Sequence, residues 1–433
     1  MKTLDPHAAG HFKVFDNPRW CTYASAVAAV IAAVLFSAFV PMPDRKAENV
    51  DYLYFYEPVA RMIVDKSFFN PTVTQTRQTF RYPPGLSFML AGVFAAAGAA
   101  HVPEDLAYRL FAILCAAISA MLAFKIGCWF WSTRGALWVA LAWSTYPLWL
   151  WSLAQPVSET PFVPVLMVSV LLLLDIFHGC KSPFVKSALL GLAYGIAMLI
   201  RPIALLLPLL GACVIIASLA YGRTGKRFAL AAVMIAAACA TIAPWEAWMH
   251  AKTGAILPLS QNGPISMYDG LTFTINGKEF RQPLAMPADV EALMRRIDRA
   301  YAESQTFRGI ASTLAHEAFL APGAVCKLAL IKAGRSWYGT NSHRRESGVL
   351  VAQLVYLVFC LAGMALYFKR KRGARAVALV MVLHLTYFWF MTMAFLSLAR
   401  YMMPVMALLF VFLPANLLAL KKKKIVASAG SVG

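Results

Sequence analysis

The first polar segment of the chain reads ENVDYLYFYEPVAR at residues 48–61 and closes with RYPPG at residues 81–85. It follows the first long apolar run, and between Pro41 and Pro84 it holds six Lys or Arg and five Asp or Glu among many aromatic residues. Charge this dense beside apolar helices forms a site, or the gate to one, more often than a linker. We therefore expect the fold to be organised around this segment and part of an active site to lie in it.

The composition is that of an integral membrane protein. The 433 residues are 60% hydrophobic, with a mean hydropathy of +0.63, and the apolar runs approach the length that crosses a bilayer, roughly 20 residues. The net charge of +20 could indicate a nucleic-acid partner, but most of the excess sits in short clusters beside apolar runs. Such clusters are typical of cytoplasmic loops. The sequence thus predicts an all-α polytopic protein whose surroundings are membrane lipids, with no nucleic acid as partner.

Positive charge decides how many apolar runs cross the membrane. If the short run Gly85–Ala100 lies in the interface, every basic cluster falls on one side, which would be the cytoplasm. If it crosses, the N-terminal cluster lies opposite nearly all the others. We therefore predict about ten transmembrane helices, with eleven as the alternative, in the cell (inner) membrane and with both termini cytoplasmic. The candidate runs are Trp20–Val40, Gly85–Ala100, Leu110–Trp131, Ala136–Ala154, Pro161–Phe177, Ser187–Ile200, Pro202–Ala220, Phe228–Met249, Val349–Phe368, Ala376–Leu398 and Met402–Leu420. The basic clusters are Lys2/Lys13/Arg19, Arg134, Lys181/Lys186, Arg223/Lys226/Arg227, Lys369–Arg372 with Arg375, and Lys421–Lys424.

This topology predicts a single domain over residues 1–420, followed by a basic cytoplasmic tail at residues 421–433. Two large outer loops belong to the domain. The loop at 41–109 is expected to be catalytic and to contain the interfacial segment 85–100. The loop at 250–346 is too polar to cross and long enough only for a small cap.

Two amphipathic helices are expected in the cap. Segment 287–308 carries apolar residues at three- and four-residue spacing: Val290, Leu293, Ile297 and Tyr301. Segment 320–338 alternates apolar residues with three cations, which is typical of a helix lying in the headgroup layer: Lys327, Lys332 and Arg335.

Two acids on the outer face are candidates for the chemistry. Asp51 lies in the first loop, where a carboxylate could take or orient the proton of an acceptor nucleophile. Its alternative role is to cap a helix of the loop, and Glu48 and Glu57 are weaker rivals. Glu159 sits in a turn of a few residues between two apolar runs, where an acid has little reason to lie unless it faces a polar cavity. Its alternative role is an acid at a helix start, favoured by the helix dipole, with Ser158 or Thr160 as the cap.

Arg201 and Arg400 each stand at the outer end of an apolar run. Guanidinium groups are suited to binding a phosphate through paired N–H donors. The alternative is that both side chains snorkel to lipid headgroups. Weaker candidates are Arg81, His250, Lys252 and His343, which could all be solvated loop residues.

Common nucleotide and hydrolase motifs are absent from the sequence. It has no Walker loop, no Rossmann glycine fingerprint, no HExxH and no GxSxG. No domain for a nucleotide sugar is visible either. An activated donor would therefore have to arrive as a membrane lipid.

Several short motifs occur in a fixed order over about residues 20–410. They are Asp51 with Ala60-Arg61-Met62, then Tyr82-Pro83-Pro84-Gly85, Pro156-Val-Ser-Glu159, Gly191-Leu-Ala, Arg201-Pro202, Ala243-Pro244-Trp245 with Gly254, and Arg400-Tyr401 with Pro404. In this order the chain resembles the GT-C superfamily of integral-membrane glycosyltransferases, in the branch of the protein O-mannosyltransferases and lipid A aminoarabinose transferases. It differs from that branch in having Tyr52 where an acid often follows Asp51, and Tyr82 where a Lys often precedes the prolines.

The resemblance implies a GT-C-like fold with juxtamembrane helices in the first outer loop. It also implies transfer of a sugar, with inversion, from a polyprenyl-phosphate donor to a lipid, glycan or protein acceptor on the outer face. Asp51 would be the catalytic or acceptor-orienting acid and Glu159 the second acid. The substrate-binding residues would be Arg201 and Arg400 at the lipid phosphate, Tyr401 in the pocket wall, and Arg81 with Tyr82. No organic cofactor or metal site is expected, although a divalent cation stays open.

Two other functions remain as alternatives. A transporter or flippase of polyprenyl-linked sugars would have internal repeats and charges near the middle of the membrane. We find no repeat, and the charges inside the apolar runs, Lys125 and Asp175, lie near their cytoplasmic ends. A non-catalytic subunit of an envelope-polysaccharide complex would tolerate loss of both Asp51 and Glu159.

Overall fold

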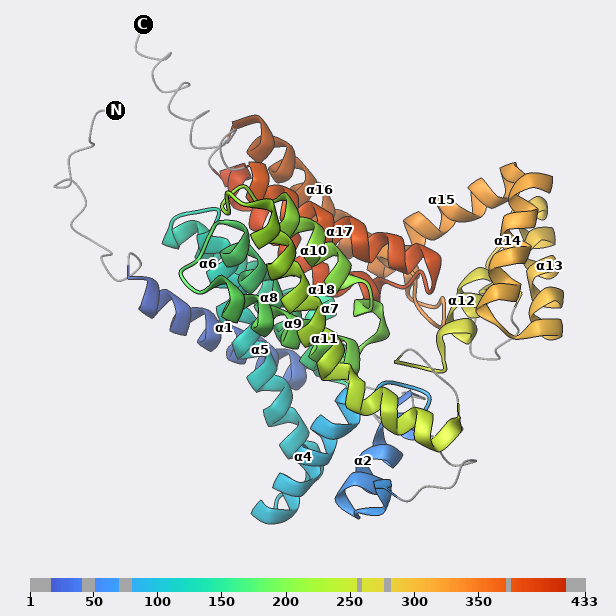
Figure 1. Cartoon of the computed structure of the whole chain (residues 1–433), viewed down its shortest axis with the longest axis horizontal. Helices are drawn as coiled ribbons and strands as arrows, with labels where there is room; N and C mark the ends of the chain where they lie inside the picture. The colour runs from blue at the N-terminus through green and yellow to red at the C-terminus, as the bar shows by residue number, and fades with distance from the viewer. Residues whose placement is uncertain are drawn as a thin grey trace, which may run out of the picture.

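The computed structural model describes residues 17–40, 51–69, 80–254, 259–275, 282–370 and 375–417, and every regular element in them is a helix (Figure 1). Lys2, Lys13, Glu48 and the tail with Lys421–Lys424 lie outside the described residues. The predictions made for them are therefore not addressed by the structure.

A bundle of long apolar helices forms most of the molecule (Figure 1). Within the described residues, eight helices are long and apolar enough to cross a membrane. The prediction of an all-α polytopic membrane protein is confirmed. The eight are α1 (Pro18–Phe39), α5 (Glu104–Cys128), α8 (Glu159–Phe177), α9 (Pro183–Ile200), α11 (Thr224–Thr253), α16 (Glu346–Arg370), α17 (Arg375–Ala394), and α18 (Ala399–Leu409) continued through η6 (Phe410–Phe412).

Two further apolar segments are interrupted. The run predicted as one helix at Ala136–Ala154 is two, α6 (Thr133–Ser144) and α7 (Pro147–Leu153), because Pro147 starts a new helix. The run after α9 breaks as predicted at Arg201-Pro202, into η4 (Pro202–Ala204) and α10 (Leu207–Ala217). With the eight long helices, these two segments give about ten that run along the bundle.

Helix α4 (Gly85–Ala100) leaves the bundle. It packs on α2 (Glu57–Val64) and on α5, at the lower end of the molecule in Figure 1. A side chain at Gly85 would place its Cβ 2.6 Å from the carbonyl oxygen of Leu199, so glycine allows the start of α4 to touch the end of α9. That this segment lies at the membrane interface stays a prediction.

An ion-pair cluster fixes the first loop. The guanidinium of Arg61 on α2 donates to both carboxylate oxygens of Glu104 at the start of α5, at 2.5 and 2.6 Å, and to Glu57 at 3.2 Å. It also lies over the ring of Phe94 on α4, 4.2 Å from the centroid. Paired N–H donors on one carboxylate hold a defined geometry. Arg61 therefore joins α2, α4 and α5. Helix α2 follows Asp51 closely in the sequence, so this cluster also fixes the part of the loop next to Asp51.

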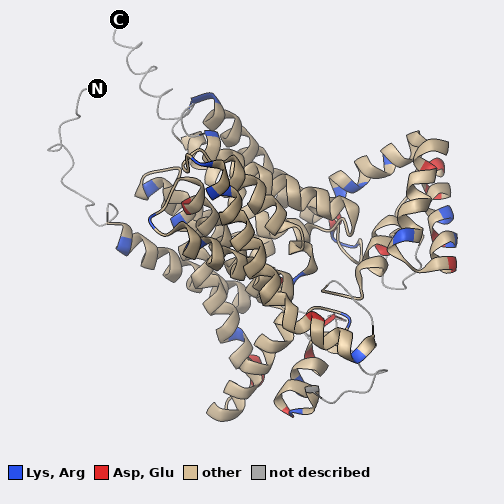
Figure 2. Ribbon diagram, viewed as in Figure 1, with Lys and Arg blue, Asp and Glu red and all other residues tan. Residues whose placement is uncertain are grey.

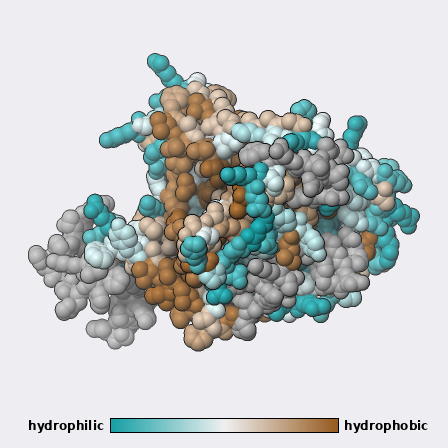
Figure 3. All heavy atoms as spheres, turned by 90° about the horizontal axis from the view of Figure 1, so that it is seen from below, coloured by the Kyte–Doolittle hydropathy of each residue, from teal (hydrophilic) through white to brown (hydrophobic). Residues whose placement is uncertain are grey.

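The two ends of the bundle differ in charge. Cys21 near the start of α1 packs with Phe124 at the end of α5 and Ala136 at the start of α6, so these chain segments share one end. Basic residues mark the loops at that end, whereas most acidic residues lie at the opposite end and on the cap, which carries basic residues as well (Figure 2). From below, hydrophobic residues form a broad band over the bundle, and hydrophilic residues gather on the side of the cap (Figure 3).

A small helical cap follows α11. It has a hydrophobic core of its own, in which Val290, Leu293 and Ile297 are fully buried, as their spacing predicts. Its helices are α12 (Gly263–Leu271), α13 (Ala288–Ser304), α14 (Phe307–Leu320) and α15 (Pro322–Tyr338).

Helix α15 was predicted to lie in the headgroup layer with three exposed cations, but two of the three are buried in the structure. Lys332 and Arg335 point inward, with exposed fractions of 2% and 4%. Each has a buried partner that satisfies it, since Lys332 donates to two backbone carbonyls and Arg335 pairs with Glu346 at 2.8 and 2.7 Å. The exposed side of α15 is mainly uncharged and includes Cys326 and Leu330.

Candidate active site

A cavity of about 60 Å³ opens at the end of the bundle opposite the basic loops. The first loop, the turn before α8, the end of α9 and the start of α18 all contribute to it. Of the site residues predicted from the sequence, the cavity brings together Asp51, Tyr82, Glu159, Arg201, Arg400 and Tyr401. The remaining wall is made by Tyr56, Pro156, Val157, Ser158, Pro202 and Ile203.

Asp51 is the accessible carboxylate of the cavity, with 32% of its side chain exposed. Its Oδ1 accepts a hydrogen bond of 3.0 Å from the Tyr82 hydroxyl, and its Oδ2 lies 3.6 Å from Nη2 of Arg400. Asp51 does stand at the start of a helix, η2 (Tyr52–Tyr56), but its side chain makes no capping hydrogen bond. The carboxylate is therefore directed to the cavity and does not serve the helix.

The η2 segment is a π-helix, and this explains why the sequence missed Tyr56. Residues five apart share a face in a π-helix, whereas the spacing used for prediction is that of the α-helix. Asp51 and Tyr56 consequently both line the cavity. Burial, with the charge of Asp51 as the next cause, raises the pKa of the Tyr56 hydroxyl above its ordinary value, so the hydroxyl stays protonated.

Glu159 opens α8 and is almost completely buried, with 3% of its side chain exposed. Its Oε1 lies 2.6 Å from Nη1 of Arg201, whose side chain is 5% exposed. Ser158 occupies the N-cap position of α8 without a side-chain capping bond. Glu159 thus stands at a helix start, which was the alternative role expected from the sequence. It also pairs with Arg201 at the cavity.

Arg201 reaches the cavity because α9 ends there. The residue before a proline is restricted to extended backbone, and Arg201, which precedes Pro202, has φ −146° and ψ 124°. The chain therefore turns away from the helix at Arg201, and the guanidinium projects beside Glu159.

Arg400 lies between the two acids, on the first turn of α18. Its Nε is 3.9 Å from Oε1 of Glu159, and its Nη2 donates a 3.1 Å hydrogen bond to the Tyr401 hydroxyl. The centroid of the Tyr401 ring lies 4.7 Å from the guanidinium of Arg201 and 5.0 Å from that of Arg400. Tyr401 therefore makes a cation–π contact with each arginine. Two arginines from distant segments are thereby fixed beside one another.

Tyr82 completes the surroundings of Asp51. Burial is the main cause that raises the pKa of its hydroxyl far above the ordinary value, and the charge of Asp51 raises it further. Tyr82 therefore remains a hydrogen-bond donor to the carboxylate at any physiological pH. Its ring also packs against Phe55 and Tyr56, with centroids 5.1 and 5.3 Å away.

Arg81 is not part of the cavity wall. Its guanidinium lies 5.6 Å from the ring centroid of Phe55, and its backbone carbonyl accepts a hydrogen bond of 2.7 Å from Ser260. Of the weaker candidates, His343 lies at the cap, with Nδ1 2.8 Å from the carbonyl oxygen of Gln282. Neither His250 nor Lys252 lines the cavity. Within the described residues, no group of three His, Cys, Asp or Glu side chains is placed to hold a metal ion.

No protein-family model and no curated protein sequence matches the chain. Among solved structures, it is similar to the archaeal oligosaccharyltransferase AglB from Archaeoglobus fulgidus, in complex with an inhibitory peptide and a dolichol-phosphate. The TM-score is 0.53 at 11% sequence identity, over 96% of this chain and 52% of the other. The chain thus spans about half the length of that structure.

A second similar structure is ArnT from Cupriavidus metallidurans bound to undecaprenyl phosphate. It has a TM-score of 0.41 and 14% identity, over 92% of this chain and 77% of the other. The likeness to AglB extends over nearly the whole chain. The chain therefore has an all-α fold similar to that of the AglB structure.

Proposed function

We propose that the protein is a membrane glycosyltransferase. It would take a sugar from a polyprenyl-phosphate-linked donor and transfer it, with inversion, to a hydroxyl-bearing lipid, glycan or protein acceptor. The observation that carries the proposal is that one cavity holds an accessible carboxylate, Asp51, facing two fixed arginines, Arg201 and Arg400. Such a set matches a reaction in which a nucleophile loses a proton while a phosphate leaves.

The reaction assigns a role to each side of the cavity. The acceptor oxygen attacks the anomeric carbon from the side of Asp51, which takes or orients the hydroxyl proton. The bond between the anomeric carbon and the phosphate oxygen breaks, and its electron pair leaves with the lipid phosphate. Arg201 and Arg400 stabilise the negative charge on that phosphate through paired N–H donors. Tyr82 keeps the Asp51 carboxylate in its orientation.

Glu159 acts on the arginines in this proposal and does not act on the acceptor. Its side chain is 3% exposed and its Oε1 lies 2.6 Å from Arg201, so it is far less accessible to a substrate hydroxyl than Asp51. Its charge would hold two guanidinium groups beside the cavity, that of Arg201 at 2.6 Å and that of Arg400 at 3.9 Å. Asp51 is then the one acid of the pair that can meet an acceptor.

The face of the membrane follows from the loop charges. Loops rich in Lys and Arg favour the cytoplasm. Helix α9 begins beside two such residues, Lys181 and Lys186, and its other end carries Arg201 in the cavity wall. We therefore place the cavity on the periplasmic or outer face of the inner membrane, where a lipid-linked sugar and an envelope acceptor can meet. The dolichol-phosphate and peptide in the similar AglB structure agree with a lipid donor and an acceptor at such a site.

The experiment uses the purified protein in lipid nanodiscs with several radiolabelled polyprenyl-phosphate sugars and a crude extract of envelope lipids and glycans. Wild type is compared with Asp51→Asn and with Asp65→Asn, an exposed acid that follows α2 in the same loop. We expect label to move to a new product with wild type and Asp65→Asn, and at least about 100-fold more slowly with Asp51→Asn. Parallel reactions with a chelator test whether a divalent cation takes part.

Two outcomes would contradict the proposal. Full transfer by Asp51→Asn would remove the assigned acid. Absence of transfer by wild type with every donor, together with movement of the labelled lipid between leaflets, would favour the flippase alternative.

A further inference from the structure

We infer that the cap sets the position of Arg400 in the cavity, through a clamp on the loop that leads into α18. The clamp consists of Gly270 on α12, Lys332 on α15 and Gly339 after α15, and it holds residues 395–398, here called the 395–398 loop. The inference rests on the proposed function for the role of Arg400. Lys332 is a positioning residue in this scheme, because it acts on the substrate only through Arg400.

Lys332 is the centre of the clamp. Its side chain is 2% exposed, and its Nζ donates to the carbonyl oxygen of Gly270 at 2.7 Å and to that of Phe395 at 2.9 Å. One amino group therefore joins α12, α15 and the 395–398 loop at a point closed to water. Removing it leaves two buried carbonyls without this donor, which is a costly state.

Gly270 brings the loop into direct contact with the cap. A Cβ at this position would lie 1.6 Å from the carbonyl oxygen of Phe395, far inside the contact distance. The backbone of the loop thus presses on the backbone of α12. Any larger residue at position 270 would have to displace the loop.

The third contact reaches the start of α18 itself. The carbonyl oxygen of Gly339 accepts a hydrogen bond of 2.9 Å from the N–H of Ala399, the residue next to Arg400. The first N–H groups of a helix have no partner within the helix, so the cap supplies one. Behind Gly339, the buried Arg335–Glu346 pair and the bond of 2.9 Å from the Thr340 N–H to Glu346 hold the turn in place.

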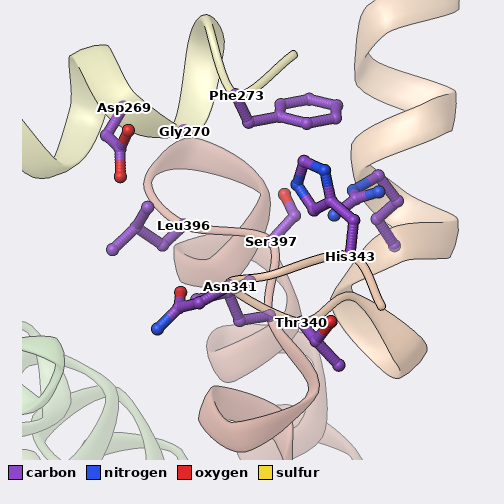
Figure 4. A pocket seen from close by; sticks show the side chains of 10 residues that line it. Asp269, Gly270, Phe273, Thr340, Asn341, His343, Leu396 and Ser397 are labelled. Atoms are coloured by element: carbon purple, nitrogen blue, oxygen red, sulfur yellow. The ribbon is translucent and has the colours of Figure 1, made fainter. Parts of the chain in front are cut away.

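The joint between cap and loop leaves little free space. Figure 4 shows the cavity that remains there, with Gly270 and Phe273 on one side and Leu396 and Ser397 on the other. Its volume is about 20 Å³, which is room for about one water molecule. A joint packed this closely moves the loop whenever the cap moves.

Small shifts of this loop matter at the cavity. Nη2 of Arg400 lies 3.6 Å from Oδ2 of Asp51, just beyond hydrogen-bond distance. A change in cap position would lengthen or shorten this gap and redirect the N–H donors toward or away from the lipid phosphate. The cap thereby gains control over donor binding without contributing a side chain to the cavity.

The test compares two clamp variants with two matched controls on α15. Lys332→Met removes the buried amine, and Lys327→Met removes an exposed one that pairs with Asp289. Gly270→Ala adds a methyl group against the loop, whereas Gly323→Ala adds one where nothing lies within 4 Å. Size-exclusion profiles and circular dichroism in detergent select the variants that fold.

Hydrogen exchange of a peptide covering residues 395–401 gives a readout that needs no catalysis. We expect exchange to be faster by about tenfold or more in Lys332→Met and Gly270→Ala, and unchanged in both controls. In transfer assays, the KM for the lipid donor should rise in the clamp variants while kcat changes about twofold at most. Unchanged exchange in both clamp variants would overturn the clamp.

The same experiment separates the clamp from the proposed function. If wild type transfers no sugar, the proposed function fails while the exchange data still decide whether the clamp exists. If exchange rises but the donor KM equals that of the controls, the clamp exists and its control of Arg400 is wrong.

Discussion

Glu159 and Arg201 form an ion pair with 2.6 Å between Oε1 and Nη1, in which neither side chain is more than 5% exposed. The two residues belong to the start of α8 and the end of α9, so the pair joins two helices at the floor of the cavity. Removing one partner of a buried pair leaves an uncompensated charge. The pair therefore stabilises the contact between α8 and α9, and in the proposed mechanism it also holds Arg201 for the phosphate.

Glu159→Ala should lower the free energy of unfolding by about 3–5 kcal/mol. Glu291→Ala, which breaks the exposed pair with Arg295 on α13, should cost about 1 kcal/mol or less. Thermal unfolding in detergent measures both. In the double variant Glu159→Ala/Arg201→Ala, the loss should be smaller than the sum of the single losses, and additive losses would show that the pair is not coupled.

Tyr82→Phe should reduce kcat by about tenfold, because it removes the hydrogen bond that orients the Asp51 carboxylate. The donor KM should stay near that of wild type, since Tyr82 does not reach the phosphate in the proposed mechanism. Steady-state kinetics with varied donor separate the two constants. A loss as large as that of Asp51→Asn would mean that Tyr82 acts directly on a substrate.

Arg400→Lys should raise the donor KM by about tenfold, since lysine cannot supply paired N–H donors to a phosphate. Arg81→Ala serves as the comparison, because Arg81 is the cation of the first loop that the sequence predicted as substrate-binding and that lies outside the cavity wall. The donor KM of Arg81→Ala should remain within about twofold of that of wild type. An equal rise of the donor KM in both variants would mean that Arg81 also binds the substrate.

Lys332 predicts a pH dependence of stability. Burial is the main cause that lowers the pKa of its amine from 10.5 to about 7, with the charge of Arg335 adding to it. Between these values the unfolded chain binds a proton that the folded chain does not, so stability should rise from about pH 7 toward pH 10. Melting temperatures at several pH values should show this rise in wild type. In Lys332→Met, the share of this rise in melting temperature that comes from Lys332 should be missing. Identical pH profiles for wild type and Lys332→Met would contradict the burial of a neutral amine.

An apolar edge of the cap should touch lipid. Phe319, Leu320 and Leu330 are 87%, 67% and 73% exposed, and α15 joins the bundle where Trp389 of α17 donates a 3.0 Å hydrogen bond to the Ala333 carbonyl. Fluorescence of a tryptophan introduced by Leu330→Trp, in a background corrected for the native tryptophans, should be quenched by brominated lipid. Arg295→Trp, on the polar surface of α13, should not be quenched. Equal quenching at both positions would exclude a defined membrane-facing edge.

The sequence was most informative where charge conflicts with an apolar surrounding. Glu159, Arg201 and Arg400 stand at the ends of apolar helices, and Asp51 in a dense polar loop, so each could be identified before its neighbours were known. The fold brings these residues to one cavity. Their catalytic roles stay predictions.

Other features could not be read from the sequence. Tyr56 depends on a π-helical turn that the usual periodicity does not describe. Arg81 is the sequence neighbour of Tyr82, so local composition does not distinguish the two. In the structure Tyr82 lines the cavity, whereas Arg81 lies over Phe55 and does not line it. The inward direction of Lys332 depends on carbonyl groups contributed by residues more than 60 positions away.

The cap has a hydrophobic core separate from that of the bundle. A helical unit with its own core can exchange surface residues, lengthen a loop or gain a helix while the bundle around the cavity keeps its packing. In evolutionary terms, the bundle and the cap can then change at different speeds. The cavity end of the bundle is constrained by the buried Glu159–Arg201 pair, whereas the surface of the cap can vary as long as the contacts of Lys332, Gly270 and Gly339 with the 395–398 loop are kept.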